Sequence, residues 1–324
     1  MLYPLKFRPI LKPIIWGGDK VCKFKNIEPL RDQIGESWEI SHVEGDVSIV
    51  ANGKLKGKTL DELIENYPDE LAGSRIIERF GKTFPLLIKF IDAREALSIQ
   101  VHPNDDLAKI KHNSLGKTEM WYVVDASETA YLYSGFSRDI TPEQYVQSVK
   151  DNNFVDYLQR YDVKSGDAFY LPAGRVHTIG AGCFIAEIQQ TSNITYRIYD
   201  YNRKDSNDNP RELHTELAKD AIDYEAYPDY KLQYDSDGKN VQKLIKCPYF
   251  TTTLINAKKS ETLSFSQQGS FSIFICLKGN GTLTDDKGNQ VTFRQGDSIL
   301  IPAENTTTIL HFEEDSKLLE THID

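Results

Sequence analysis

The feature that most constrains the fold of this 324-residue chain is an internal repeat. The segments VKSGDAFYLPAGRVHTI (residues 163–179) and FRQGDSILIPAENTTTI (residues 293–309) share Gly-Asp, four further residues and Pro-Ala in one register. Such a repeat predicts that one supersecondary unit occurs twice. His177 in the first copy corresponds to Thr307 in the second. An imidazole in only one copy favours a function there over a requirement of the fold.

The pattern along both copies is typical of antiparallel β-structure. Short runs rich in aromatic and β-branched residues end at Gly, Asn, Asp or Pro, as in GNGTLTDDKGNQVTFRQGDSILIP. Helical patterns interrupt the strands at residues 59–81, 141–160 and 209–223. The second of these begins with a capping box, in which Thr141 precedes Pro142 and Gln144 follows three residues after the cap. We expect a mainly β protein with small helical insertions in its N-terminal half.

The repeat also suggests how the chain divides. A Tyr- and Asp-rich stretch at residues 224–240 is polar and rich in turn residues, as linkers are. We therefore expect residues 1–240 to form one unit that carries the helical insertions. Residues 241–324 are expected to form a second unit that consists almost entirely of strands and turns.

Composition excludes several classes of function. A formal net charge of -10 argues against nucleic acid as a main partner, because neutralising phosphates requires a basic surface. No apolar run reaches the length of a membrane span, and the N-terminus lacks the pattern of a signal peptide. The four cysteines are far apart and match no zinc-binding spacing. We expect reduced thiols in a cytoplasmic protein with no membrane contact.

A candidate metal site follows from the stretch LSIQVHPNDD at residues 97–106, which resembles the end of a strand. Gln100 and His102 lie two residues apart and therefore share one face of that strand. Glu119 begins the apolar run EMWYVV, and His177 follows a turn rich in Gly and Pro. Each residue alone has an ordinary explanation, such as a hydrogen-bonded His at a strand end. Together they suit zinc, with manganese, cobalt or iron as alternatives, at a catalytic site open to water or substrate.

Longer segments carry a resemblance to a known family. The spacing of GDAFYLPAGRVH resembles the second cupin motif, and the Gln/His pair with the later Glu resembles the first. The strings FPLLIKFIDAREALSIQVHPND, GKTEMWYV and LPAGRVHTIGAGCFIAEIQQTSNITYRIYDY resemble the type I mannose-6-phosphate isomerases, in their short bacterial form. The N-terminal strings IWGG and GESWEIS extend the resemblance over essentially the whole chain. It implies a double cupin of two jelly-roll β-barrels, of which the second is degenerate and metal-free.

The resemblance also implies an activity, the interconversion of mannose 6-phosphate and fructose 6-phosphate through an enediol in mannose metabolism. It implies one zinc ion per chain, held by Gln100, His102, Glu119 and His177. Catalytic roles near the metal are implied for Lys89, Lys117 and Arg197. Either lysine can be the base only if its pKa falls toward neutrality. Arg197 is expected to stabilise the enediolate or to hold the phosphate, and a salt bridge to Asp200 is the rival explanation for it.

The chain departs from the longer members of that family at several positions. Leu115 and Gly116 replace an Asn-His pair before Lys117, and Thr118 replaces a proline before the Glu ligand. Asn193 stands where those members have an Asp, and an amide cannot relay a proton by ionising.

Other functions remain open on the residues alone. The same metal chemistry serves isomerases of other sugars or sugar phosphates. A non-catalytic cupin that senses a sugar phosphate is an alternative that Asn193 makes plausible. An iron dioxygenase would require more histidines. No Gly-rich nucleotide-binding loop is present, which argues against a fused guanylyltransferase. The oligomeric state is not predicted.

Overall fold

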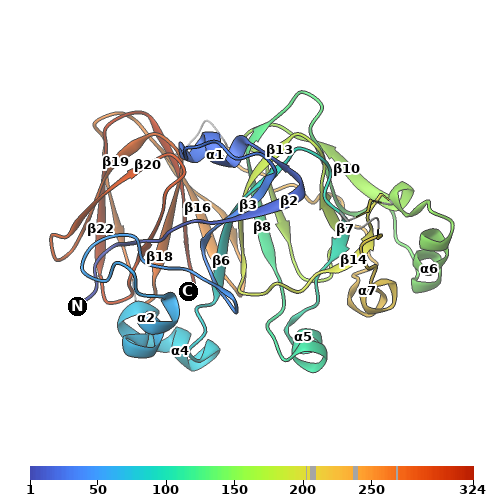
Figure 1. The fold of residues 1–324 in the computed structure, drawn as a ribbon, viewed down its shortest axis with the longest axis horizontal. Coiled ribbons are helices and arrows are strands. Elements are labelled where there is room, and N and C mark those ends of the chain that lie inside the picture. Colours follow the sequence, from blue (N-terminus) through green and yellow to red (C-terminus); the bar gives the residue numbers. More distant parts are fainter. Residues whose placement is uncertain (202, 205–208, 236–239, 268) are drawn as a thin grey trace.

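The computed structural model describes residues 1–324 except residues 202, 205–208, 236–239 and 268, so part of the predicted linker lies outside the described residues. The described chain is mainly β, as expected. Figure 1 shows two β-rich lobes side by side, one coloured green to teal and the other orange to red. None of the described helices has the length and apolar character needed to cross a membrane.

The first unit contains two antiparallel sheets that share a core. Its six-stranded sheet has the order β11 (Ala168–Leu171), β8 (Glu119–Ala126), β13 (Cys183–Gln190), β6 (Leu86–Ala93), β2 (Ile10–Gly18), β3 (Ile34–Ile40). Its five-stranded sheet has the order β10 (Leu158–Asp162), β9 (Tyr131–Phe136), β12 (His177–Ile179), β7 (Ile99–Val101), β14 (Tyr196–Tyr199). A short pair, β4 (His42–Val43) and β5 (Asp46–Val47), lies outside both sheets. Apolar side chains of the two large sheets, such as Ile185 and Leu132, form one buried cluster between them.

The second unit repeats this arrangement. Its six-stranded sheet has the order β1 (Leu5–Lys6), β21 (Ser298–Ile301), β18 (Ser272–Lys278), β23 (Ser316–His322), β16 (Thr251–Ala257), β15 (Val241–Lys246). Its four-stranded sheet has the order β17 (Thr262–Ser266), β22 (Thr307–Phe312), β19 (Asn280–Asp285), β20 (Gln290–Arg294). The N-terminal strand β1 thus belongs to a sheet made otherwise of residues from the C-terminal end. The division at residue 240 stays a prediction.

The two six-stranded sheets pack against each other. Phe90 of β6 lies in the same buried cluster as Ile273 of β18 and Leu319 of β23. Both faces of the first sheet are therefore covered, and all eight residues of β6 and of β13 are buried. Strands buried on both faces lose the simple alternation of apolar and polar residues, because both faces meet a core.

The helices are α1 (Lys20–Lys25), α2 (Leu60–Asn66), α3 (Pro68–Leu71), α4 (Ser74–Phe80), α5 (Asp105–His112), α6 (Pro142–Lys150) and α7 (Thr215–Ala221), with a 3-10 turn at Phe154–Tyr157. The capping box at Thr141 is confirmed. The helix predicted for residues 141–160 was too long, because Asn152 adopts a positive φ and the chain returns as β10. The helices α1 and α5 were not predicted, although Asn104 caps α5 through its side chain.

The repeated turn differs between the two units. The strands β12 and β22 begin at His177 and Thr307, as the repeat predicts. In β12, Ile179 packs into the core between the two sheets, so His177 on the same face also points inward. In β22, Leu310 belongs to the inner core, so Thr308 is the inward residue. The inward counterpart of His177 is therefore Thr308, one residue later than the sequence comparison suggests.

Candidate metal centre and active site

Polar residues gather on the inner face of the first six-stranded sheet. In β6, Ile88 and Phe90 point toward the second unit, whereas Lys89 between them points into the first. The strand register places Glu187 of β13 opposite Lys89, and Gln189 opposite Glu119 of β8. This register brings charged side chains from three neighbouring strands together in a buried setting.

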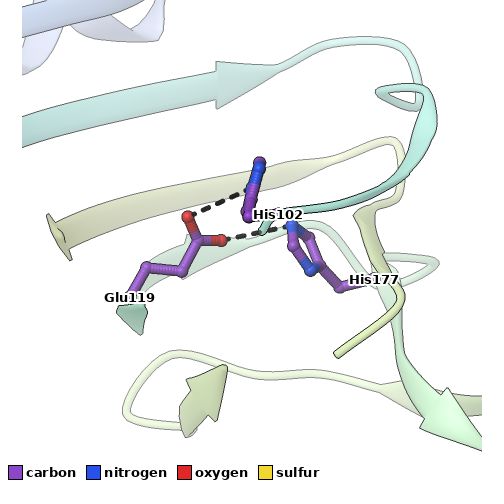
Figure 2. Close-up of side chains that lie close together, drawn as sticks. All are labelled: His102, Glu119 and His177. Carbon is purple, nitrogen blue, oxygen red and sulfur yellow. Dashed lines mark ion pairs between the residues drawn. The ribbon is translucent and has the colours of Figure 1, made fainter. Parts of the chain in front are cut away.

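Three buried residues converge on one point (Figure 2). The two carboxylate oxygens of Glu119 lie 3.3 Å from His177 Nε2 and 3.5 Å from His102 Nε2. Each of these side chains is at most 2% exposed. His177 is delivered by β12 after a turn in which Gly174 adopts φ +90° and donates a backbone hydrogen bond to the carbonyl of His102. The turn and the first His-bearing segment are thereby linked directly.

Both imidazoles are held in the form that binds a metal. His102 Nδ1 lies 2.8 Å from the carbonyl oxygen of Ile194, and His177 Nδ1 lies 2.8 Å from that of Arg175. A carbonyl only accepts, so each Nδ1 carries the proton and each Nε2 presents a lone pair to the centre. Burial and the charge of Lys117 lower the pKa of His177 to about 3, and the same two causes lower the pKa of His102 well below its usual range. Both rings are neutral at physiological pH.

The two imidazole nitrogens and the carboxylate of Glu119 therefore present lone pairs to one point, where a positive charge would be stabilised. Burial and the nearby charge of Glu187 raise the pKa of Glu119 to about 7. One oxygen of Glu119, Oε1, is buried and has no hydrogen-bond partner among the described residues. The ammonium of Lys117 supplies positive charge here, with Nζ 2.6 Å from Glu119 Oε2 and 3.0 Å from His102 Nε2. Acceptors that face one another at these distances fit a divalent cation.

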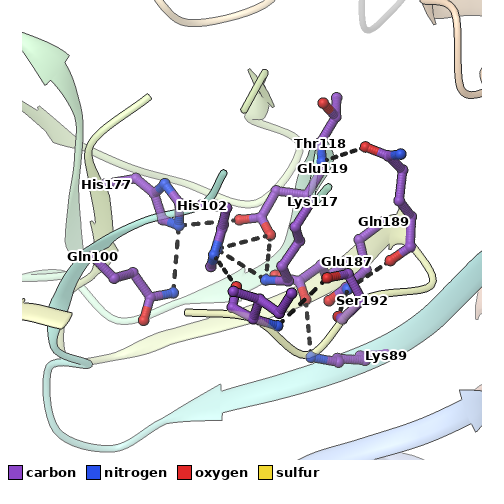
Figure 3. A network of polar contacts seen from close by, with 12 residues as sticks. Lys89, Gln100, His102, Lys117, Thr118, Glu119, His177, Glu187, Gln189 and Ser192 are labelled. Atoms are coloured by element: carbon purple, nitrogen blue, oxygen red, sulfur yellow. Dashed lines mark hydrogen bonds and ion pairs between the residues drawn. The ribbon is translucent and has the colours of Figure 1, made fainter. Parts of the chain in front are cut away.

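Gln100 lies at the edge of this centre. Its amide nitrogen is 3.4 Å from His177 Nε2, and its amide oxygen accepts from the Ser98 hydroxyl at 3.4 Å. A half-turn of the amide exchanges its nitrogen and oxygen, so the oxygen can face the same point as the imidazoles. The structure thus brings all four predicted ligands together, as Figure 3 shows.

Lys89 is buried in a pocket of negative charge. Its Nζ lies 3.4 Å from Glu36 and 3.4 Å from Glu187, and it lies over the ring of Trp38. Burial acts to lower the pKa of Lys89, but Glu36 and Glu187 outweigh it, so the net shift is upward. A raised pKa keeps this amine protonated, which is opposite to what a base at neutral pH requires.

Arg197 does not form the salt bridge to Asp200 that was the rival explanation for it. Within the described chain Asp200 pairs with Arg203 and, through two bonds of 2.6 Å, with Arg211. Arg197 instead donates to the carbonyl oxygen of Glu212, and its Nε is buried with no described partner. Burial and repulsion by Arg211 lower the pKa of Arg197. This cluster therefore holds excess positive charge.

One cleft of about 160 Å³ joins these groups. Its lining includes all three predicted cationic residues and Gln100. Asn193 also lines the cleft but is exposed, so it lies at the edge rather than in a buried relay. Among the charged lining residues, sequence reasoning missed Glu36, Glu187 and Arg211. The signal for Glu187 is a lone carboxylate within the apolar run CFIAEI, whereas nothing local marks Arg211.

Comparisons with known proteins agree with this geometry. The model of the catalytic domain of type I phosphomannose isomerase matches residues 5–150, and that of the mannose-6-phosphate isomerase cupin domain matches residues 240–311. Mannose-6-phosphate isomerase ManA of Bacillus subtilis is 37% identical over 303 residues, covering 92% of this chain and 93% of that protein. The Streptococcus mutans mannose-6-phosphate isomerase is 33% identical over 99% of both chains.

Solved structures of mannose 6-phosphate isomerases also resemble this chain. The crystal structure of mannose 6-phosphate isomerase from Bacillus subtilis superposes with a TM-score of 0.89 at 31% identity, covering 99% of this chain and 100% of that one. A mutant phosphomannose isomerase from Salmonella typhimurium superposes with a TM-score of 0.80 at 16% identity, which is a likeness of fold alone.

Proposed function

This chain belongs to the type I mannose-6-phosphate isomerases, and from that membership we propose how its own residues interconvert mannose 6-phosphate and fructose 6-phosphate. The reaction moves a proton between C2 and C1 of the open-chain sugar through an enediol. The observation that carries the assignment of the site is the convergence of two neutral imidazoles and one carboxylate on a single buried point. That point adjoins a cleft lined by cations.

We propose that the ion is zinc, one per chain, and that the four predicted ligands hold it. Two imidazoles, one carboxylate and one amide oxygen are ligands that zinc accepts, and the set leaves room for substrate. When bound, the ion stabilises the negative charge that develops on the sugar oxygens in the enediolate. Glu119 and His177 would hold it from β8 and β12, with His102 and Gln100 completing the set.

We propose Lys117 as the residue that moves the proton. Its Nζ touches the metal centre and its side chain lines the cleft, so it reaches both the ion and the substrate. A base at this position acts through the neutral amine. Lys89, whose pKa is raised, is assigned to binding: its ammonium would orient the sugar from the opposite side of the cleft.

We propose that Arg197 and Arg211 receive the phosphate. Both line the cleft, and among the described residues three guanidinium groups face the carboxylates of Asp200 and Glu212. Arginine binds phosphate through paired hydrogen bonds, and a dianion would relieve the repulsion within this cluster. A few local cations of this kind let a chain of net charge -10 bind an anionic sugar.

The two parts of the chain have different proposed roles. We propose that residues 1–240 form the catalytic unit and residues 241–324 a metal-free partner, because the His/Glu/His group lies in the first part of the described chain. We also propose that the enzyme works in the cytoplasm, since its four cysteines are free thiols.

A coupled assay for fructose 6-phosphate formed from mannose 6-phosphate tests the assignment. Activity should vanish when the protein is stripped with a chelator and should return on addition of zinc, with manganese, cobalt and iron compared in parallel. His177→Ala should lose both metal and activity, whereas His311→Ala, an exposed histidine in the second unit, should keep both. Stripped protein that remains fully active would refute the metal assignment.

A further inference from the structure

The second unit contains a cleft larger than the one that adjoins the candidate metal centre. Its volume is about 430 Å³, and small-molecule sites span about 300–1,000 Å³. Its lining comes from β15, β16, β17, β18 and β23 together with Arg75 of α4. The cleft therefore opens over the inner face of the second six-stranded sheet.

The strand register shows that this cleft lies at the position of the catalytic cleft. In the first unit Glu187 of β13 is opposite Lys89 of β6. In the second unit Glu320 of β23 is opposite Thr253 of β16, and the sheet order around them is the same. Both glutamates are buried, and each lines the cleft of its own unit. One carboxylate has thus been kept in place while the lysine has become a threonine.

A second pair of positions extends the correspondence. Gln189 is opposite Glu119 in the first unit, and His322 is opposite Ser272 in the second. The metal-binding carboxylate is therefore replaced by a hydroxyl. The cleft is present in both units, but hydroxyl groups stand in the second at the positions of Lys89 and Glu119 in the first.

The polar groups of this cleft do not form a metal site. His322 directs Nδ1 to Glu320 at 2.9 Å and Nε2 to Asp324 at 3.6 Å, so its two nitrogens face different carboxylates. Among the described residues, clustered His and carboxylate ligand atoms occur only in the first unit. The hydroxyl of Ser272 also donates to Glu320.

The groups favour a neutral ligand that offers many hydroxyls. Glu320 and Asp324 would repel an anion, His322 is already paired with both, and Arg75 is engaged in an interaction of its own. The amide nitrogen of Gln267 is buried without a partner among the described residues, and the hydroxyl of Ser266 is exposed at the edge of the cleft. Carboxylate acceptors beside hydroxyl and amide donors match the groups of a sugar ring.

We propose that this cleft is a second binding site, distinct from the catalytic one, for an unphosphorylated sugar. Ligand-observed saturation-transfer NMR with free mannose on the full-length protein tests it. Ser266→Trp places an indole at the cleft edge, and Thr253→Val removes a hydroxyl from its wall while keeping the side-chain shape. Ser264→Trp is the matched control, because Ser264 is exposed on the same strand but does not line the cleft.

The expected result is a saturable mannose signal in the wild-type protein and in His177→Ala, in which the metal centre is disrupted. The signal should fall by about tenfold or more in Ser266→Trp, weaken in Thr253→Val and persist in Ser264→Trp. The isomerase activity of Ser266→Trp should equal that of the wild type, which separates this test from that of the proposed function.

Three results would overturn the proposal. One is the absence of saturable binding at mannose concentrations in the tens of millimolar, roughly the weakest affinity that a specific site of this kind would show. Another is a signal that persists in Ser266→Trp but disappears in His177→Ala, which would locate the sugar in the catalytic cleft. The third is displacement of mannose by inorganic phosphate in His177→Ala, which would make this an anion site.

Discussion

Lys117 and Glu119 form a 2.6 Å ion pair inside the metal centre, although only one residue separates them in the chain. Glu119 belongs to β8, and Lys117 lies just before that strand. Both are at most 6% exposed. The proposed proton carrier and a proposed metal ligand are therefore held against each other by local geometry.

Replacing Lys117 should separate chemistry from metal binding. We expect Lys117→Ala to lower kcat by about 10²–10⁴-fold, the usual contribution of a general base. Metal content should stay at one ion per chain, because the ammonium competes for Glu119 rather than coordinating. Activity and elemental analysis on the same sample measure both. Lys111→Ala on helix α5, where the side chain is exposed, is the control. Full turnover in Lys117→Ala with intact metal would remove Lys117 from the mechanism.

Replacing Lys89 should cost stability as well as activity. We expect Lys89→Met to lower the free energy of unfolding by about 3–5 kcal/mol, because it removes the buried ammonium that lies 3.4 Å from both Glu187 and Glu36. Urea titration followed by tryptophan fluorescence measures the change. Lys12→Met is a matched control, since Lys12 lies over the same Trp38 ring but is partly exposed. Its cost should be below about 1 kcal/mol. Equal costs for the two variants would contradict the buried-charge argument.

Arg211 should determine the preference for a phosphorylated sugar. We expect Arg211→Met to raise KM for mannose 6-phosphate by about 10–100-fold, equivalent to one or two charge-assisted hydrogen bonds, with a smaller effect on kcat. Arg203→Met is the control, because Arg203 also pairs with Asp200 but does not line the cleft. Steady-state kinetics on both variants measure KM and kcat. A similar rise in KM for both would show that Asp200, rather than Arg211, is the sensitive element.

The ion pair of His322 should make stability depend on pH. Its hydrogen bond to Glu320 raises the pKa of His322 above 6.5 in the folded protein. The folded state thus favours the proton, so the stabilisation is complete below the unfolded pKa and is lost as pH rises through the raised folded pKa. We expect His322→Gln to lower Tm more at about pH 6 than at about pH 9. A Glu320→Gln background should reduce that difference, and an equal loss of Tm at both pH values would be inconsistent with the pair.

The convergence of the four predicted ligands was predictable because these residues lie in short, recognisable segments. Gln100 and His102 share a strand face, and His177 follows a turn whose Gly and Pro pattern is visible in the sequence. The cationic part of the cleft was harder to predict from the sequence. Arg211 acquires its position through Asp200, a pairing that no local spacing reveals. The environment that raises the pKa of Lys89 likewise depends on strand register, which brings Glu36 and Glu187 to it from two different strands.

For the fold as well, short sequence patterns predicted some features correctly, whereas features set by distant segments were missed. Local patterns predicted the mainly β character and the capped start of α6 correctly. The predicted end of α6 was wrong, because residues 158–162 pair with β9 in a sheet despite their helical periodicity. The one-residue offset that makes Thr308 rather than Thr307 the inward residue depends on a turn, whose geometry the shared Pro-Ala does not fix.

The pairing of β1 with β21 has a consequence for biosynthesis. Leu5 aligns with Leu300, so during translation β1 waits for a partner that lies far later in the chain. The outer face of the first six-stranded sheet likewise stays uncovered until β18 and β23 arrive. During translation the catalytic half therefore exposes an apolar sheet surface, the kind of intermediate on which chaperones act. A nascent chain stalled before residue 300 would carry all four proposed metal ligands, but its strand β1 would still lack its partner β21.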